Sequence, residues 1–83
     1  MHDKEAADAR FLALLPAIER ESWDNRNFVR KAVNWALRQI GKRNAGLRQP
    51  AIECARRILA QGTPAARWIA RDALRELTRP ARS

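Results

Sequence analysis

Apolar residues recur every three or four positions along most of the chain, and short polar breaks separate the resulting segments. This spacing places apolar side chains on one face of a helix, whereas a half-buried strand would alternate apolar and polar residues. The pattern predicts four helices, at approximately residues 5–21, 25–42, 47–60 and 64–78. The sequence has no alternating run and no Asn-Gly or Asp-Gly hairpin signal, so the predicted fold class is all-α.

The start of the second helix is predicted from a capping pattern. Asp24 is a favourable N-cap residue, and Trp23 before it has the spacing from Phe28 that is typical of a hydrophobic staple. Within the first helix, Pro16 is expected to kink or divide the helix, because proline removes a backbone hydrogen bond.

The sequence QGTP predicts the end of the third helix and the start of the fourth. Gly62 suits the position just after a helix, Thr63 suits an N-cap, and Pro64 suits the first turn. The third helix also contains a proline, Pro50, which is tolerated only near the start of a helix.

Two helix–turn–helix pairs of similar length follow one another, with a period of about 38–40 residues. This period is typical of HEAT repeats, so we predict an α-solenoid of HEAT-like helix pairs, with two repeats in a partial superhelix. A plain four-helix bundle is the competing architecture. Because solenoids generally need three or more repeats for stability, residues 1–83 are expected to form one all-helical module of a larger protein.

The second helix combines an apolar arc with a polar side that holds a tryptophan. At about 100° per residue, the arc contains Phe28, Val29, Ala32, Val33, Ala36, Leu37 and Ile40. Trp35 lies at one edge of this arc. The polar residues beside it are Lys31, Arg38 and Lys42, followed by Asn27 and Asn34.

This combination suits a nucleic-acid ligand. Cations pair with phosphates, amides donate to phosphate or sugar oxygens, and an indole offers a flat face to a sugar or a base. The alternative is that Trp35 packs against a neighbouring helix while the cations stay in water. Helical geometry alone leaves both interpretations open.

The charge of the chain favours a polyanionic partner. Lys and Arg total 17 against 9 Asp and Glu, which gives a net charge of +8 and a pI near 11.5. Residues 1–21 have a net charge of −2, whereas residues 22–83 have a net charge of +10. Such a basic domain indicates nucleic acid as the partner. A solvated, arginine-rich surface is the alternative interpretation.

The fourth helix repeats the basic pattern. Four arginines recur at every fourth position and predict a cationic stripe: Arg67, Arg71, Arg75 and Arg79. Trp68 lies near this stripe, and Asp72 and Glu76 are expected to pair with arginines one turn away. The alternative is that the stripe is simply a solvated face.

Several other kinds of function are excluded by composition. The one cysteine, Cys54, excludes an internal disulfide and a multi-cysteine metal site, and it is expected to be a small packing residue. We predict no metal site and no cofactor. No apolar run approaches the ~20 residues of a membrane span, and the N-terminal sequence MHDKEAAD lacks a signal-peptide core. We therefore expect a cytoplasmic protein without membrane contact.

The sequence DNRNFVRKAVNWALRQIGKRN, followed by a helix of the pattern AI..A..I and then by ARWIARDALREL, resembles a known family. It is similar to the C-terminal part of the HEAT-like-repeat DNA alkylation repair enzymes, which are all-helical alkylpurine DNA glycosylases. The resemblance extends from about residues 2–4 to Thr78. It implies a curved α-solenoid whose concave, basic face holds duplex DNA.

The resemblance also implies an activity and some site residues. Members of the family excise N3- and N7-alkylated purines without base flipping. Cleft aromatics contact the deoxyribose, and an Asp stabilises the developing oxocarbenium ion. The Trp of NWALR corresponds to Trp35, and the DNA-contacting Arg three residues later corresponds to Arg38.

One departure from the family affects catalysis. In the family, the catalytic Asp and a second aromatic residue lie in repeats upstream of the matching C-terminal segment. This chain begins at Met1, just before that segment, so those repeats are expected to be absent. We therefore predict no catalytic residue, and we expect the isolated chain to be inactive. Trp68 and Asp72 have a Trp-x-x-x-Asp spacing, but they fall on the wrong helix for the family site and are interpreted as structural.

The predicted function is that of a DNA alkylation repair protein fragment that binds duplex DNA weakly, with strong salt dependence and little sequence preference. The predicted DNA-binding residues are Lys31, Asn34, Trp35, Arg38, Lys42, Arg71 and Arg75. The alternative is a non-enzymatic interaction module whose acidic first helix pairs with missing N-terminal repeats or forms a homo-oligomer. A third interpretation, an amphipathic protein on a membrane surface, is disfavoured because the apolar arcs are needed for packing between helices.

Overall fold

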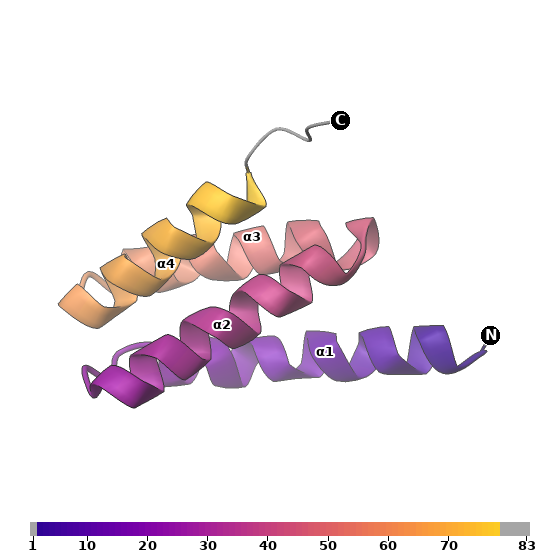
Figure 1. Ribbon diagram of the computed structural model, residues 1–83, viewed down its shortest axis with the longest axis horizontal. Helices are drawn as coiled ribbons and strands as arrows, with labels where there is room; N and C mark the ends of the chain where they lie inside the picture. The colour runs from indigo at the N-terminus through magenta and orange to yellow at the C-terminus, as the bar shows by residue number, and fades with distance from the viewer. Residues whose placement is uncertain (1, 79–83) are drawn as a thin grey trace.

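The computed structural model describes the backbone of residues 2–78 and the side chains of residues 8–78 of the 83-residue chain. Four helices make up this part of the protein: α1 (His2–Glu21), α2 (Asn27–Arg43), α3 (Ala45–Ala60) and α4 (Pro64–Leu77) (Figure 1). There is no strand among these residues, so the predicted all-α class is confirmed.

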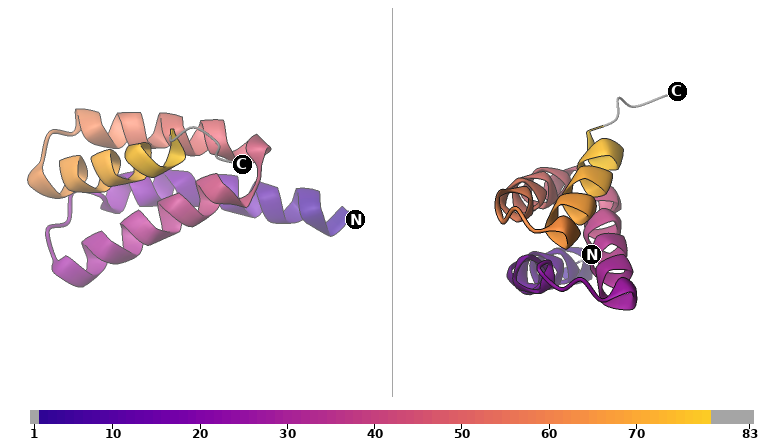
Figure 2. Two further views of the ribbon diagram at one scale, coloured as in Figure 1. Left: turned by 45° about the horizontal axis from the view of Figure 1, so that its top comes forward. Right: turned by 90° about the vertical axis from the view of Figure 1, so that its left-hand side faces the viewer.

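The four helices form two layers. α1 and α3 lie side by side in one layer, and α2 and α4 lie side by side in the other (Figure 2). α2 also packs against α1 and α3, and α3 also packs against α4, whereas α1 and α4 do not touch within the described part of the chain. Two consecutive helix pairs that pack in this way form an all-helical fold consistent with a helical repeat.

The core between the layers is built from branched side chains and alanines. Leu37, Ile58 and Ile69 are fully buried. The facing surfaces of α3 and α4 contribute small buried residues, among them Ala55 and Ala70. Small side chains at a helix contact allow the two helix axes to approach closely, so these alanines let α3 and α4 pack tightly.

The turn between α1 and α2 differs from the predicted cap. α2 begins at Asn27, and the residue before it, Arg26, makes no side-chain cap hydrogen bond. Asp24 is buried, and its Oδ1 accepts a hydrogen bond of 2.9 Å from the backbone N–H of Arg26. The Arg26 guanidinium donates to the same carboxylate, which lowers the pKa of Asp24. Asp24 therefore closes the turn instead of capping α2.

The predicted hydrophobic staple is also wrong. Trp23 and Phe28 are 59% and 69% exposed. The guanidinium of Arg26, whose Cζ lies 5.6 Å from the ring centroid of Phe28, covers part of that ring. Once Asp24 is engaged with Arg26, α2 starts too late for the two aromatic side chains to hold the spacing of a staple.

Both prolines that lie inside helices are tolerated. α1 continues through Pro16, which is exposed, so the helix is not divided there. α3 starts two residues earlier than predicted because Asn44 caps it, with Oδ1 accepting a hydrogen bond of 3.0 Å from the backbone N–H of Leu47. Pro50 therefore lies in the second turn of α3.

The predicted turn between α3 and α4 is confirmed. Gly62 has a φ of +79°, a left-handed conformation that glycine adopts without strain. The Thr63 hydroxyl accepts a hydrogen bond of 3.1 Å from the backbone N–H of Ala66, and Pro64 is the first residue of α4. These are the roles that the QGTP sequence predicts.

The buried face of α2 is rotated relative to the predicted apolar arc. Phe28 and Ala32 are exposed, whereas Asn34 and Gly41 are buried. A Cβ on Gly41 would lie 2.5 Å from a methyl group of Leu77, so the α2 backbone approaches α4 closely at this point. This close approach fixes the rotation of α2 and turns the opposite side of the helix toward solvent.

Candidate nucleic-acid interface

Two rows of side chains, each with a spacing of four residues, face each other between α2 and α4. We call them the α2–α4 seam: Arg30, Asn34, Arg38 and Lys42 on α2, and Trp68, Asp72 and Glu76 on α4. Residues four apart lie on one face of a helix, so each row forms a continuous edge. Every residue of the α2 row contacts α4.

Asn34 is the buried centre of the seam. It is 2% exposed, and its Nδ2 donates a hydrogen bond of 3.2 Å to the carbonyl of Ile69. Its Oδ1 accepts a hydrogen bond of 2.9 Å from Nε of Arg38. Asn34 was predicted to contact DNA directly. Because its side chain is buried, that prediction is wrong. Asn34 instead anchors α4 and orients the Arg38 guanidinium.

Arg38 and Lys42 share one carboxylate, that of Glu76. Arg38 Nη1 lies 2.8 Å from Oε1, and Lys42 Nζ lies 3.1 Å from Oε2. The hydrogen bonds from Arg38 and from Lys42 lower the pKa of Glu76. Asp72 adds a more distant contact, with Oδ2 3.7 Å from Arg38 Nε. Both predicted DNA-binding cations of the seam are therefore ion-paired within the fold.

Arg30 and Trp68 form the other end of the seam. The Cζ of Arg30 lies 4.7 Å from the ring centroid of Trp68, which is a cation–π arrangement. Arg30 Nη2 also donates a hydrogen bond of 2.8 Å to Oδ1 of Asn27. This contact holds the Trp68 ring against α2 while 40% of the residue remains exposed.

An open cleft of about 650 Å³ runs along this seam, and we call it the α2–α4 cleft. Its lining residues are Lys31, Ala32, Asn34, Trp35, Arg38, Trp68 and Asp72. Trp35 is 59% exposed, so its ring is not enclosed in the core. The predicted residues Lys31, Trp35 and Arg38 therefore meet in one cleft, together with Trp68 from α4.

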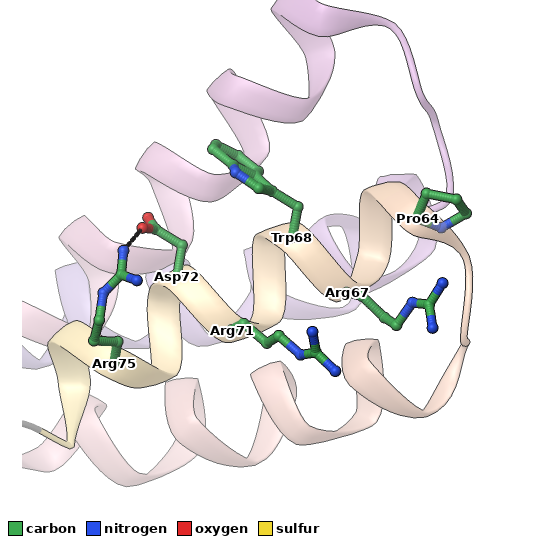
Figure 3. A pocket seen from close by; sticks show the side chains of 6 residues that line it. All are labelled: Pro64, Arg67, Trp68, Arg71, Asp72 and Arg75. Atoms are coloured by element: carbon green, nitrogen blue, oxygen red, sulfur yellow. Dashed lines mark hydrogen bonds and ion pairs between the residues drawn. The ribbon is translucent and has the colours of Figure 1, made fainter.

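The outer side of α4 carries further cations. A second open cleft is lined by Pro64, Arg67, Trp68, Arg71, Asp72 and Arg75 (Figure 3). Trp68 and Asp72 point toward α2, whereas Arg67 and Arg71 extend away from it (Figure 3). Arg75 is ion-paired with Asp72. Arg79, the last residue of the predicted stripe, lies outside the described residues.

Four cations of this layer have no carboxylate partner among the residues that the structure describes, and one of them, Arg30, is half-buried against Trp68. The other three lie on the surface. These exposed cations are Lys31, Arg67 and Arg71. Together, α2 and α4 contain eight Lys and Arg residues against two Asp and Glu residues. Such an excess of exposed positive charge next to exposed indoles can bind a polyanion that presents flat rings or sugars.

The sequence did not reveal Arg30 as part of the site or Glu76 as the partner of Arg38 and Lys42. A signal was available for both. Arg30 continues the four-residue spacing of the α2 row, and Glu76 continues the spacing of Trp68 and Asp72 on α4. Two such rows on helices that pack together are expected to meet, but the sequence does not say which helices pack together.

Other kinds of site find no support in this structure. Within residues 8–78, no group of three or more His, Cys, Asp and Glu side chains could hold a metal ion. Cys54 is fully buried, and burial raises the pKa of its thiol to about 11, so it remains a neutral packing residue. None of the four helices is both long and apolar enough to cross a membrane.

Comparison with known proteins identifies the family. A family model described as DNA alkylation repair enzyme matches residues 2–77. Searches of curated proteins and of solved structures found no significant match to the chain. The family match spans nearly the whole sequence and includes all four helices. The chain therefore belongs to the DNA alkylation repair enzyme family.

Proposed function

We propose that this chain is a DNA-binding helical-repeat module of a DNA alkylation repair protein, and that it binds duplex DNA through the layer formed by α2 and α4. The family supports a role in DNA alkylation repair. The observation that supports this surface most strongly is the α2–α4 cleft, where two exposed tryptophans, Trp35 and Trp68, stand among cations. In this proposal the helix pairs continue as an α-solenoid whose concave face includes α2 and α4.

Each group in this layer has a chemical role in the proposal. Lys31 and Arg71 pair with phosphates, because both are exposed and have no carboxylate partner in the described part of the chain. Trp35 places its indole against a deoxyribose or a base edge. Contacts with phosphate and sugar carry no sequence information, so binding is largely independent of sequence.

Removal of alkylated purines would need a carboxylate whose negative charge is available to a developing oxocarbenium ion. Asp72 is the carboxylate in the α2–α4 cleft, and it is ion-paired with Arg75 and lies 3.7 Å from Arg38. We propose that the 83-residue chain binds DNA but does not by itself excise N3- or N7-alkylated purines. Release of 7-methylguanine from methylated DNA by the purified chain would contradict this part of the proposal.

Binding is tested by fluorescence anisotropy of a short labelled duplex at several salt concentrations. The logarithm of the association constant is expected to fall linearly with the logarithm of the salt concentration, with a slope of about −0.9 for each phosphate contacted. Duplexes of unrelated sequence should bind equally. Lack of binding at low salt, where the electrostatic contribution is largest, would contradict the proposal.

The location of the surface is tested by paired variants. The double substitution Lys31→Ala and Arg71→Ala removes two exposed cations of the α2/α4 layer, so the salt slope should decrease by about 2. The matched control, Arg10→Ala with Arg56→Ala, removes two exposed cations from α1 and α3 and should leave the slope nearly unchanged. An equal loss in both variants would show that only net charge matters.

A second candidate function is a non-enzymatic interaction module that associates with another copy of the chain through α1. A groove between α1 and α2 favours it, because it is lined mainly by apolar groups, including Phe11, Leu14, Trp35 and Ile40. This candidate predicts a dimer whose stability depends little on salt and no affinity for DNA. Sedimentation at low and high salt separates the two candidates, because the first predicts a salt-sensitive complex that forms only with DNA.

A further inference from the structure

Glu76 holds two cations of α2 at once. Its Oε1 lies 2.8 Å from Arg38 Nη1 and its Oε2 lies 3.1 Å from Lys42 Nζ. Arg38 and Lys42 are one turn apart on α2, and Glu76 lies in the last turn of α4. One carboxylate group thus bridges two basic residues, with one oxygen for each.

This geometry is the one that a phosphodiester group would use. A phosphodiester also carries one negative charge and presents two non-bridging oxygens that accept hydrogen bonds from cationic donors. The Arg38 and Lys42 side chains that the carboxylate joins could therefore hold a DNA phosphate in its place. Both cations lie at the edge of the layer that we propose as the DNA-binding surface.

We propose that Glu76 is a built-in competitor that occupies a phosphate subsite formed by Arg38 and Lys42, and that it must move aside when the backbone of DNA binds there. This inference rests on the proposed function, because it requires that a polyanion reach the α2/α4 layer. The proposed function names contacts that promote DNA binding. The inference names a carboxylate of the same chain that opposes it.

The surroundings allow Glu76 to move without disturbing the fold. Its side chain is 30% exposed and belongs to the penultimate residue of α4, so its carboxylate can turn into solvent. Arg38 stays in place when Glu76 leaves, because its Nε remains hydrogen-bonded to the buried Oδ1 of Asn34. The subsite is therefore positioned before the phosphate arrives.

Competition by Glu76 makes the subsite of Arg38 and Lys42 more accessible to polyanions than to single small anions. A free phosphate ion must displace Glu76, which is tethered beside the cations and so has a high effective concentration. A duplex that is already held at Lys31 and Arg71 presents its next phosphates at a similarly high effective concentration. Only an anion that also binds elsewhere on this layer can then compete well for Arg38 and Lys42.

The central experiment compares duplex binding by the unchanged chain and by Glu76→Gln, with the same anisotropy measurement across salt concentrations. The substituted side chain keeps a hydrogen-bond acceptor for Arg38 but loses the negative charge. We expect the affinity to rise by about three- to tenfold, because two partly exposed ion pairs no longer have to be broken. The salt slope should become steeper by about 1. Circular dichroism checks that both proteins have the same helical content.

The matched control is Glu19→Gln. Glu19 Oε1 lies 2.9 Å from Nε of Arg57, and this ion pair between α1 and α3 lies in the other layer. The substitution changes the net charge by the same amount and also releases one arginine. We expect less than a twofold change in affinity. An equal gain from Glu19→Gln would overturn the inference, because it would show a general effect of net charge.

A second test asks whether the gain depends on the two cations. In a chain with Arg38→Gln and Lys42→Gln, the additional change Glu76→Gln should no longer raise the affinity. A gain that persists in this background would overturn the inference. If the unchanged chain binds DNA but Glu76→Gln brings no gain, the inference fails and the proposed function stands. If neither protein binds duplex at low salt, both fail.

Discussion

The α1/α3 layer and the α2/α4 layer both contain an ion pair between their helices, but the two layers differ in charge. Each layer has interhelical ion pairs, Glu19 with Arg57 between α1 and α3, and Glu76 with Arg38 between α2 and α4. Within residues 8–78, α1 and α3 have five Lys and Arg residues against four Asp and Glu residues, whereas α2 and α4 have eight against two.

The exposed aromatic rings sharpen this difference. The two tryptophans within helices, Trp35 and Trp68, belong to α2 and α4 and line the same cleft. The third, Trp23, lies in the turn at the end of the molecule, beside Glu19 and Arg20. Packing alone does not require exposed indoles or uncompensated cations. The α2/α4 layer therefore combines two exposed indoles with a larger excess of positive charge than the α1/α3 layer, and the proposed DNA binding would use this combination.

The largest expected effect is on the free energy of unfolding, and it distinguishes a core residue of α2 from a residue of the proposed DNA interface. Leu37 is fully buried on α2, and Leu37→Ala should lower the free energy of unfolding by about 2–5 kcal/mol, because it leaves a cavity between the layers. Trp35→Ala, on the opposite side of the same helix, should change it by less than about 0.5 kcal/mol. Urea denaturation followed by circular dichroism measures both values. Similar losses would show that Trp35 is a structural residue.

A smaller loss of stability is expected at the centre of the α2–α4 seam. Asn34→Ala removes the hydrogen bond to the Ile69 carbonyl and leaves Nε of Arg38 without its amide partner. The expected cost is about 1–3 kcal/mol of unfolding free energy, with weaker DNA binding because Arg38 is no longer oriented. Asn25→Ala, an exposed amide in the turn before α2, is the control and should change neither quantity. Unchanged DNA affinity in Asn34→Ala would contradict the positioning role.

Trp35 and Trp23 allow a comparison of duplex DNA affinity between two equally exposed indoles. Trp35→Ala should lower the affinity for duplex DNA by about 1 kcal/mol, the lower end of the range for aromatic contacts with nucleotides. Trp23→Ala removes an indole of equal exposure far from the α2–α4 cleft and should lower the affinity by less than twofold. Anisotropy titration measures both. A larger loss for Trp23→Ala would place the DNA on a different surface.

The smallest effect is the pH dependence of the ion pair at Glu76. Its pKa is lowered below the ordinary value of 4.5 in the folded protein, so the pair stabilises the fold above that value and its contribution is lost as the pH falls through the lowered pKa. Because the pair is partly exposed, Glu76→Gln should cost at most about 1 kcal/mol at pH 7. In strong acid the variant and the unchanged chain should be equally stable by urea denaturation. A difference that grows on acidification would have the wrong sign.

Local sequence signals predicted much of the fold. The four helices, the all-α class and the turn of Gly62, Thr63 and Pro64 followed from periodicity and capping, which depend on neighbouring residues. The turn before α2 was mispredicted even though it is local. Asp24 can cap a helix or hydrogen-bond the backbone two residues on, and the ion pair with Arg26 favours the second arrangement.

The candidate site was predicted less completely, because it depends on contacts between helices. The sequence placed Lys31, Trp35 and Arg38 near each other on one helix, and the structure confirms that they line one cleft. The burial of Asn34 was missed. It follows from the rotation of α2, which the contact of Gly41 with Leu77 determines, and those residues are far apart in sequence.

The most direct test of the central claim is to map the DNA contact surface by NMR, using the three indole N–H signals and the backbone amides during titration with a short duplex. We predict that the signals of Trp35 and Trp68 shift together, along with the amides of Lys31 and Arg71. The Trp23 indole and the amides of α3 should remain in place. Shifts confined to Trp23 or to the α1/α3 layer would contradict the assignment of DNA binding to α2 and α4.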